Sequence, residues 1–456
     1  MAMDMQQAQL LAAILWSRDL APLETLISHL VSLFYEQRSQ AEDMFDECIL
    51  TDPKKLFHKL GEVLHSSPYE GSRGTSATLL QTHGLLCILI SELASMILPL
   101  NGWPELLRFA FDWSKSDSLN LQESGFLILV GLSQFNGQTL ISSMEDIHQV
   151  CLECLTSTSR SLDVKLAASS AVASFIPVFS HSGGDLMLFH DVLRTITMTL
   201  KEALNSQQEA AAQELLKLLI ELVEAVPGLF GRELDKVLEH MMQIATTETL
   251  EEGTRHLAIG FLIALVEARE RAAMMRELID DLVRFPCELF AILLKMLLDI
   301  EDEPAWYTTD NEDEDAGGSS NYNAAKDYMG LFAIAADALD VTVVAFEQLR
   351  AYLDGPEWQE PHAALIALAC IFEGFAEKMI QNIETVMLMV LSSFQNPHPR
   401  VRWAATNAVK QLAMDLGPNL RVPFHSHVLE ALESFTHDPH SLRIQVNGVI
   451  YRFGVQ

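Results

Sequence analysis

The sequence predicts an all-α solenoid, a right-handed superhelix of antiparallel helix pairs. Three observations predict it: apolar residues recur with helical spacing, proline-rich turns recur at a constant interval, and glycine and proline are scarce, with 22 and 16 among 456 residues. Leu and Ala dominate the apolar residues, which favours helix over strand. Because 49% of the residues are apolar, the chain can bury a large core. We therefore expect little or no β-sheet.

The clearest repeat unit begins at Met379. We expect a first helix from Met379 to Phe394, because its apolar residues follow the three- and four-residue spacing of one helix face. The segment 396–399 (Asn-Pro-His-Pro) forms the next turn, since two prolines prevent the helix from continuing. A second helix then begins at Arg400 and ends before Gly417. The unit is therefore a helical hairpin.

The same turn recurs along the chain. Pro356, Pro397 and Pro439 occupy equivalent places, 41 and 42 residues apart. This interval is typical of HEAT and armadillo repeats, in which each hairpin packs on its neighbours and the stack presents a long concave binding surface. We therefore expect a HEAT- or armadillo-type array. Weaker matches predict comparable second helices at Leu121, Val164 and Arg255.

We divide the chain into four parts. Residues 1–75 form a divergent N-terminal helical region, residues 76–298 and 327–456 form HEAT repeats, and residues 299–326 form an acidic flexible insertion. The second block of repeats ends abruptly, early in a second helix, as in a truncated form. We expect an exposed apolar end there, formed by Ile444, Val449, Ile450 and Phe453.

The insertion is the strongest departure from the repeat pattern. No positive charge occurs between Lys295 and Lys326, and a Gly-Gly-Ser-Ser segment follows the carboxylates. Because close like charges repel, we expect a flexible loop. One interpretation is a solvated spacer without a role, and the other is a segment that attracts or gates a basic partner by its charge. The candidate partner-binding residues are its nine carboxylates, Asp299, Glu301, Asp302, Glu303, Asp310, Glu312, Asp313, Glu314 and Asp315.

Net charge narrows the classes of partner. Acidic residues outnumber basic ones by 62 to 30, a formal charge of −32. Such a chain repels the phosphates of nucleic acid and attracts basic proteins, so no direct nucleic-acid binding is expected. The alternative is that the acidity only keeps the surface soluble. The longest apolar run, residues 85–100, is too short and too polar to span a bilayer, so we expect no membrane partner.

No arrangement typical of an enzyme is found in the sequence. Gly-rich phosphate loops and nucleophile motifs are lacking, so we expect no catalytic residues, cofactor or metal. Cys151 and Cys154 have the spacing of metal ligands, but no second pair matches them, and their apolar helical context predicts core packing. Histidines near one turn are expected at the surface, namely His425, His427, His437 and His440.

The segment 394–409 reads Phe-Gln-Asn-Pro-His-Pro-Arg-Val-Arg-Trp-Ala-Ala-Thr-Asn-Ala-Val. It resembles a HEAT repeat of the importin β (karyopherin β) nuclear transport receptors, most closely the karyopherin β-three branch, also called importin five. Segments 103–107 and 224–227, Trp358 with His362, and the acidic insertion near Trp306 resemble the same family in the same order. The resemblance covers roughly residues 76–456. The residues of the repeat signature are Pro397, Arg400, Arg402, Trp403 and Asn407.

This resemblance implies a receptor that carries basic cargo proteins, such as ribosomal proteins or histones, through the nuclear pore. It further implies release of cargo by Ran-GTP, contact with FG nucleoporins, and localisation in cytoplasm and nucleus. In that family the acidic loop bears on Ran and cargo exchange, here at Asp310 and residues 312–315. The first 75 residues depart from the family's opening repeats, which form its Ran-binding arch. The alternative is a HEAT-repeat scaffold that binds proteins without Ran dependence.

Overall fold

The computed structural model describes residues 5–17, 19, 21–30, 104–231, 233–271, 284–308, 317–336, 341–372, 374–415 and 418–433, with Ala41, Met44, Cys48, Thr51 and Lys59. Regular secondary structure in these ranges is helical, and the pairing of β type found there is one isolated antiparallel bridge between Ile300 and Gly318. The all-α prediction is therefore confirmed. The chain divides into two compact units, residues 1–199 and 200–456.

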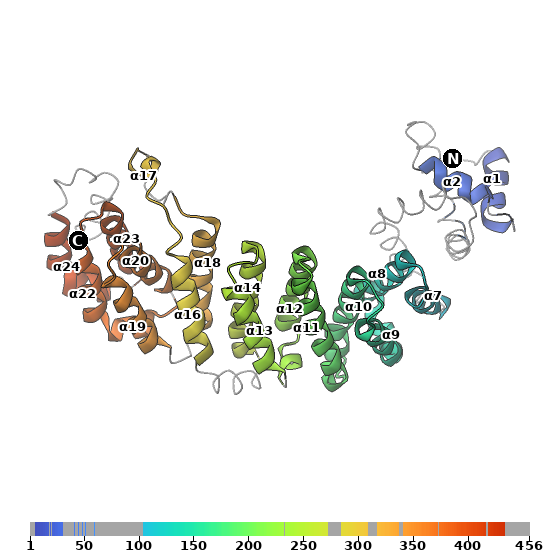
Figure 1. The fold of residues 1–456 in the computed structure, drawn as a ribbon, viewed down its shortest axis with the longest axis horizontal. Helices are drawn as coiled ribbons and strands as arrows, with labels where there is room; N and C mark the ends of the chain where they lie inside the picture. Colours follow the sequence, from blue (N-terminus) through green and yellow to red (C-terminus); the bar gives the residue numbers. More distant parts are fainter. Residues whose placement is uncertain are drawn as a thin grey trace. The chain divides into compact units, whose positions relative to one another are not determined.

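The first unit contains helical hairpins that pack in sequence order (Figure 1). Helix α8 packs against α7 and α10, and α10 packs against α9. The helices of this unit are α1 (Met5–Trp16), α2 (Ala21–Leu30), α7 (Pro104–Ser114), α8 (Leu119–Asn136), η1 (Gly137–Ser143), α9 (Met144–Thr156), α10 (Leu162–His181), η2 (Leu186–Phe189) and most of α11 (His190–Asn205).

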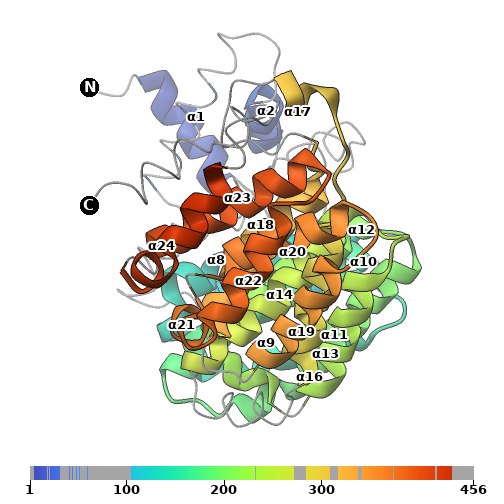
Figure 2. The same cartoon turned by 90° about the vertical axis from the view of Figure 1, so that its left-hand side faces the viewer.

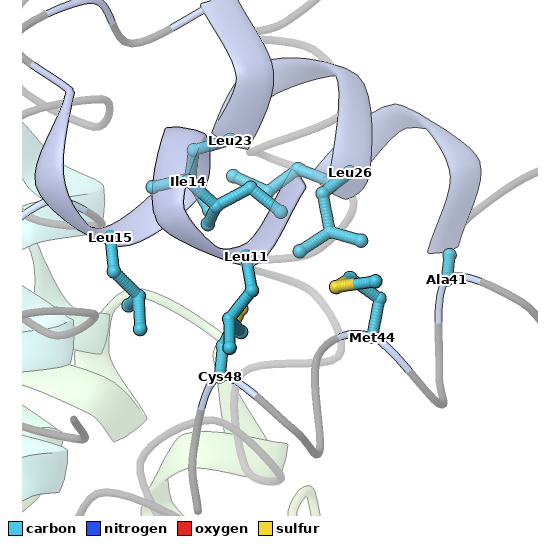
Figure 3. Packing of buried hydrophobic residues seen from close by; sticks show 9 residues of the cluster. Leu11, Ile14, Leu15, Leu23, Leu26, Ala41, Met44 and Cys48 are labelled. Atoms are coloured by element: carbon cyan, nitrogen blue, oxygen red, sulfur yellow. The ribbon is translucent and has the colours of Figure 1, made fainter. Parts of the chain in front are cut away.

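Helices α1 and α2 share a small apolar core (Figure 3). Leu11, Ile14 and Leu15 lie on one face of α1 because they are spaced three and four residues apart. They pack with apolar residues of α2 and of the segment that follows it, namely Leu23, Leu26, Ile27, Ala41, Met44 and Cys48. Most other residues of the predicted N-terminal region lie outside the described ranges.

Close packing in the first unit depends on small residues. At Gly125 of α8, an added Cβ would lie 2.7 Å from the carbonyl oxygen of Ala110 on α7, so only glycine allows this approach.

Helix α10 begins at a Ser161 cap, whose hydroxyl accepts a hydrogen bond from the amide of Val164. Among the described helices, α10 is long and apolar enough to cross a membrane, but 61% of that window is buried, as in a core helix.

Cys151 and Cys154 lie on the buried face of α9. Both thiols are free, and burial raises the pKa of each, to about 11 for Cys154. The Cys154 thiol points to the carbonyl of Val164 on α10 at 3.9 Å. The prediction that this pair packs in the core is therefore confirmed. Of the four predicted surface histidines, His425 is half-buried, His427 is exposed and the other two lie outside the described ranges.

The second unit is built from two layers of helices (Figures 1 and 2). In the first layer, α12, α14, α18, α20 and α23 each pack closely on the next. In the second layer, α13, α16, α19 and α22 pack mainly on their partners in the first layer and touch one another less. Its helices are α12 (Glu209–Ala225), η3 (Pro227–Phe230), α13 (Leu234–Thr246), α14 (Glu252–Arg271), α16 (Arg284–Met296), α17 (Pro304–Thr308), α18 (Ser320–Ala335), α19 (Thr342–Leu353), α20 (Gln359–Ile371), α21 (Ala376–Gln381), α22 (Ile383–Ser393), α23 (Pro399–Asp415) and α24 (Pro418–Glu433).

Most predicted helix starts are confirmed. Leu121, Val164, Arg255 and Arg400 lie in the first turns of α8, α10, α14 and α23. The single helix predicted from Met379 to Phe394 is wrong, because the chain breaks at residue 382 into α21 and α22. The side-chain amide of Asn382 donates to the carbonyl of Lys378 at 2.9 Å, which competes with regular helix bonding.

The acidic insertion ends earlier than predicted. Helix α18 begins at Ser320, so the last seven residues of the predicted insertion are helical. The hydroxyl of Ser319 caps this helix by accepting from the amide of Tyr322 at 3.1 Å. The predicted apolar end of the array, at Ile444 and beyond, lies outside the described residues.

Candidate functional site

The acidic insertion leaves the helical stack after α16 and returns to it at α18. Its described ends, residues 299–308 and 317–319, form the insertion base. Two backbone hydrogen bonds join the ends: the amide of Glu301 donates to the carbonyl of Gly317 at 3.1 Å, and that of Ser319 to the carbonyl of Asp299 at 3.3 Å. The Ser319 hydroxyl also donates to the Asp299 carboxylate at 2.6 Å. The two ends of the insertion therefore close against each other.

Gly317 is required for this closure. Its φ of +96° lies in the left-handed region that favours glycine. An added Cβ would lie 2.5 Å from the carbonyl oxygen of Glu301 and 3.3 Å from the guanidinium of Arg400. The Gly-Gly-Ser-Ser segment that indicated flexibility in the sequence thus contains a residue with a specific steric role.

Arg400 binds the insertion base to the stack. This arginine is in the first turn of α23, and its side chain is fully buried. Its guanidinium donates to the carbonyl of Glu301 and lies 5.2 Å from the ring centre of Trp306 and 5.4 Å from that of Trp358. A buried cation is costly unless it is hydrogen-bonded or faces aromatic rings. The carbonyl of Glu301 and the ring of Trp306 both belong to the insertion base, so the base supplies a hydrogen-bond acceptor and an aromatic face to this cation.

Aromatic rings from four helices meet beside this arginine. The ring of Trp306 on α17 meets that of Trp403 on α23 edge to face, with centres 6.4 Å apart. The buried imidazole of His362 on α20 stacks on Trp403 at 6.3 Å and on Tyr322 of α18 at 6.1 Å. We call Trp306, Tyr322, Trp358, His362 and Trp403 the aromatic cluster. It joins the insertion base to α18, α20 and α23.

A second contact holds the insertion base through His398. His398 stacks on Trp358 with ring centres 4.3 Å apart and planes 6° apart. Its Nε2 atom lies 3.4 Å from the carboxylate of Asp302, to which the Tyr307 hydroxyl also donates at 2.9 Å. Burial lowers the pKa of His398, and Asp302 partly offsets this effect. Burial, followed by the hydrogen bond to Asp302, raises the pKa of Tyr307.

The nine predicted carboxylates therefore divide into three groups. All four described acids are exposed on the base; the carboxylates of Asp299 and Asp302 also accept hydrogen bonds within it, and Glu301 and Glu303 form the second group. Asp310 and the four acids of residues 312–315 lie outside the described ranges. A role in partner binding stays a prediction for all nine.

The five residues of the repeat signature also have different positions. Arg400 and Trp403 lie at the insertion base, as described above. Arg402 donates to the carbonyls of Asn396 and Pro397, each at 2.9 Å, and so holds its own turn. Pro397 is exposed in that turn, and Asn407 is half-buried on α23.

Sequence reasoning missed most of the aromatic cluster as part of one site. Tyr322 and His398 were not singled out, Trp306 served only to identify the resemblance, and Trp358 and His362 served to identify the repeat and the resemblance. One usable signal was present, because Trp358 and His398 each closely follow a turn proline in neighbouring repeats. Residues at equivalent places of adjacent hairpins lie side by side in a stack.

Two family descriptions match this chain. "IPO5-like, TPR repeats" matches residues 81–240, and "Importin repeat" matches residues 247–337. Importin subunit beta-3 of Saccharomyces cerevisiae is 26% identical over 352 residues, which cover 76% of this chain and 31% of that protein. A probable importin-5 homolog of Dictyostelium discoideum is 22% identical over 329 residues, covering 69% and 28%. The matched segments thus cover less than a third of the length of these relatives.

Solved structures show the same fold. Kap121p bound to Nup53p superposes with a TM-score of 0.74 at 22% identity, covering 98% of this chain and 44% of that one. Kap121p bound to RanGTP gives 0.70 at 22% identity, covering 95% and 44%. These similarities confirm the predicted solenoid of helical repeats.

Replacing Arg400 tests the anchoring of the base. Arg400→Met keeps the side-chain volume but removes the hydrogen bond to Glu301 and the cation over two rings. We expect a loss of about 2 to 4 kcal/mol in the free energy of unfolding, and faster proteolytic cleavage in the insertion. Arg402→Met on the same helix is the matched control, since Arg402 donates to the carbonyls of Asn396 and Pro397 in its own turn. Equal cleavage rates in the two variants would contradict the anchoring role.

The contact between His398 and Asp302 predicts a pH response. Because burial disfavours the imidazolium, the pKa of His398 in the folded chain is below its ordinary value. The stability this group contributes is therefore present above about pH 6.5 and is lost as the pH falls toward the lowered pKa. Asp302→Asn removes the nearby negative charge and should lower this pKa further, as measured by NMR titration of labelled histidines. A raised or unchanged value would show that Asp302 does not act on His398.

Proposed function

We propose that this chain, which belongs to the importin β family of nuclear transport receptors, binds basic cargo proteins for import into the nucleus under the control of Ran-GTP. The observation that carries the proposal is the acidic insertion, whose base is joined to three first-layer helices by Arg400 and the aromatic cluster. A charged segment held in this way can transmit the presence of a partner to the repeats on either side.

Electrostatics supports a basic partner. Glu301 and Glu303 are exposed on the base, and five more carboxylates follow in the insertion sequence. At physiological ionic strength, exposed charges act over about 8 Å, so a dense group of carboxylates attracts cations far better than the same charges spread widely. The formal charge of −32 adds a weaker attraction over the whole surface. Basic cargo, such as ribosomal proteins or histones, has the complementary charge.

The matched proteins support the transport role. They are importins by name, not enzymes. Solved complexes of Kap121p contain Pho4p, Ste12p, Nup53p or RanGTP, so that protein binds several partner proteins as well as Ran. By analogy, we propose that this chain contacts Ran-GTP and FG nucleoporins and acts in both cytoplasm and nucleus, with transient residence at the pore.

Cargo release by Ran tests this function. The purified chain is immobilised and exposed to cell lysate, with and without Ran locked to GTP. We expect retention of basic nuclear proteins and their release when Ran-GTP is added. Retention that is indifferent to Ran would contradict the proposed regulation and would favour a scaffold. Absence of basic proteins from the retained fraction would contradict the proposed cargo class.

Charge reversal tests the acidic insertion itself. Changing Asp310, Glu312, Asp313, Glu314 and Asp315 to Lys should weaken the binding of a basic protein such as a purified histone. Because fewer ionic contacts remain, the dependence of affinity on salt should also become flatter. Fluorescence anisotropy at several salt concentrations measures both.

The matched control reverses the same number of exposed carboxylates elsewhere, which keeps the change in net charge equal. Suitable positions are Asp112, Asp117, Glu239, Asp354 and Glu377. If this control weakens binding as much as the insertion variant does, the insertion acts only through net charge.

A further inference from the structure

An open groove of about 460 Å³ runs along the second layer of the second unit. One wall is a face of α19, from Thr342 to Arg350, and the other is the junction of α21 and α22, where Asn382 breaks the helix. The groove exists because helices of the second layer touch one another less than those of the first layer. Nothing in the proposed cargo function uses this groove.

The lining of the groove is cationic, unlike the chain as a whole. Arg350 and Lys378 face it, and Glu347 is its only carboxylate, whereas acids outnumber bases by 62 to 30 overall. The Arg350 side chain is exposed and forms no ion pair with any described residue. A guanidinium and an ammonium in one groove suit carboxylates, which the arginine can bind through two parallel hydrogen bonds.

Apolar side chains lie between the charged groups. Val343 lines the groove and is 61% exposed. Phe346, one turn further along α19, lines the same groove. Together they form a small apolar patch that could cover one aliphatic or aromatic side chain.

The junction of α21 and α22 adds polar groups to the second wall. Gln381 and Asn382 add exposed carboxamides, which can bond to a peptide backbone.

We propose that this groove binds a short acidic peptide segment of another protein, with carboxylates on Arg350 and Lys378 and one apolar side chain on Val343 and Phe346. Eight residues of helix separate Thr342 from Arg350, a rise of about 12 Å, which matches roughly four residues of extended chain. The open shape suits a peptide better than an enclosed small molecule. The partner is opposite in charge to the basic cargo expected at the insertion.

Direct binding tests the proposal. The probe is a fluorescein-labelled peptide of six residues, one Phe flanked by Asp and Glu, with a peptide carrying Lys in place of each acid as the control. In anisotropy titrations we expect the acidic peptide to bind and the Lys-containing control peptide not to bind. The double variant Arg350→Ala with Lys378→Ala should weaken its binding at least tenfold. Lys236→Ala, an exposed lysine on α13, is the matched control and should change nothing.

A second variant separates binding from stability. Val343→Ser changes a side chain that is 61% exposed in the groove, so it should leave the melting temperature nearly unchanged while weakening peptide binding several-fold. Failure of the wild type to bind the acidic peptide, or equal binding by the double variant, would overturn the proposal. The double variant should retain basic proteins as well as the wild type does. A failure of acidic-peptide binding can therefore be distinguished from a failure of cargo binding.

Discussion

Burial of the Arg400 charge is the constraint on which the second unit's candidate site depends. A cation removed from water requires partners, and this one finds them in the carbonyl of Glu301 and the faces of Trp306 and Trp358. These partners come from the insertion base and from the turn before α20, so the arginine of a later repeat fixes the place where the acidic segment leaves the stack. The remaining rings of the aromatic cluster pack on one another and on Trp306, which links these partners to α18, α20 and α23.

The repeat architecture makes such a contact possible. First-layer helices pack closely enough for residues at the starts of α18, α20 and α23 to meet, although the hydrogen bond from Arg400 to Glu301 spans 99 residues of sequence. The second layer is looser, and its groove has a lining unlike the rest of this acidic chain. The stack thus carries two different surfaces, an acidic insertion at the closely packed layer and a groove lined by Arg350 and Lys378 at the looser one.

The sequence predicted what is encoded locally. Prolines and apolar spacing are read within about 40 residues, and they predicted the hairpins and most helix starts. The break at Asn382 was missed because it depends on one side chain that competes for the Lys378 carbonyl. The aromatic cluster was missed for a different reason: its rings come from four helices, and no local pattern shows which turn meets which. Arg400 and Trp403 were predicted as a repeat signature, but their contact with the insertion was visible only in three dimensions.

The most direct test of this account is hydrogen exchange at the insertion base of the unaltered protein. If Arg400 makes the base a rigid part of the stack, the amides of Glu301, Ser319 and Tyr322 should exchange about as slowly as those in the middle of α20, because all are released by the same opening. Exchange of these three amides at the rate of an unprotected loop, with α20 still protected, would show that the base opens independently and would contradict the account.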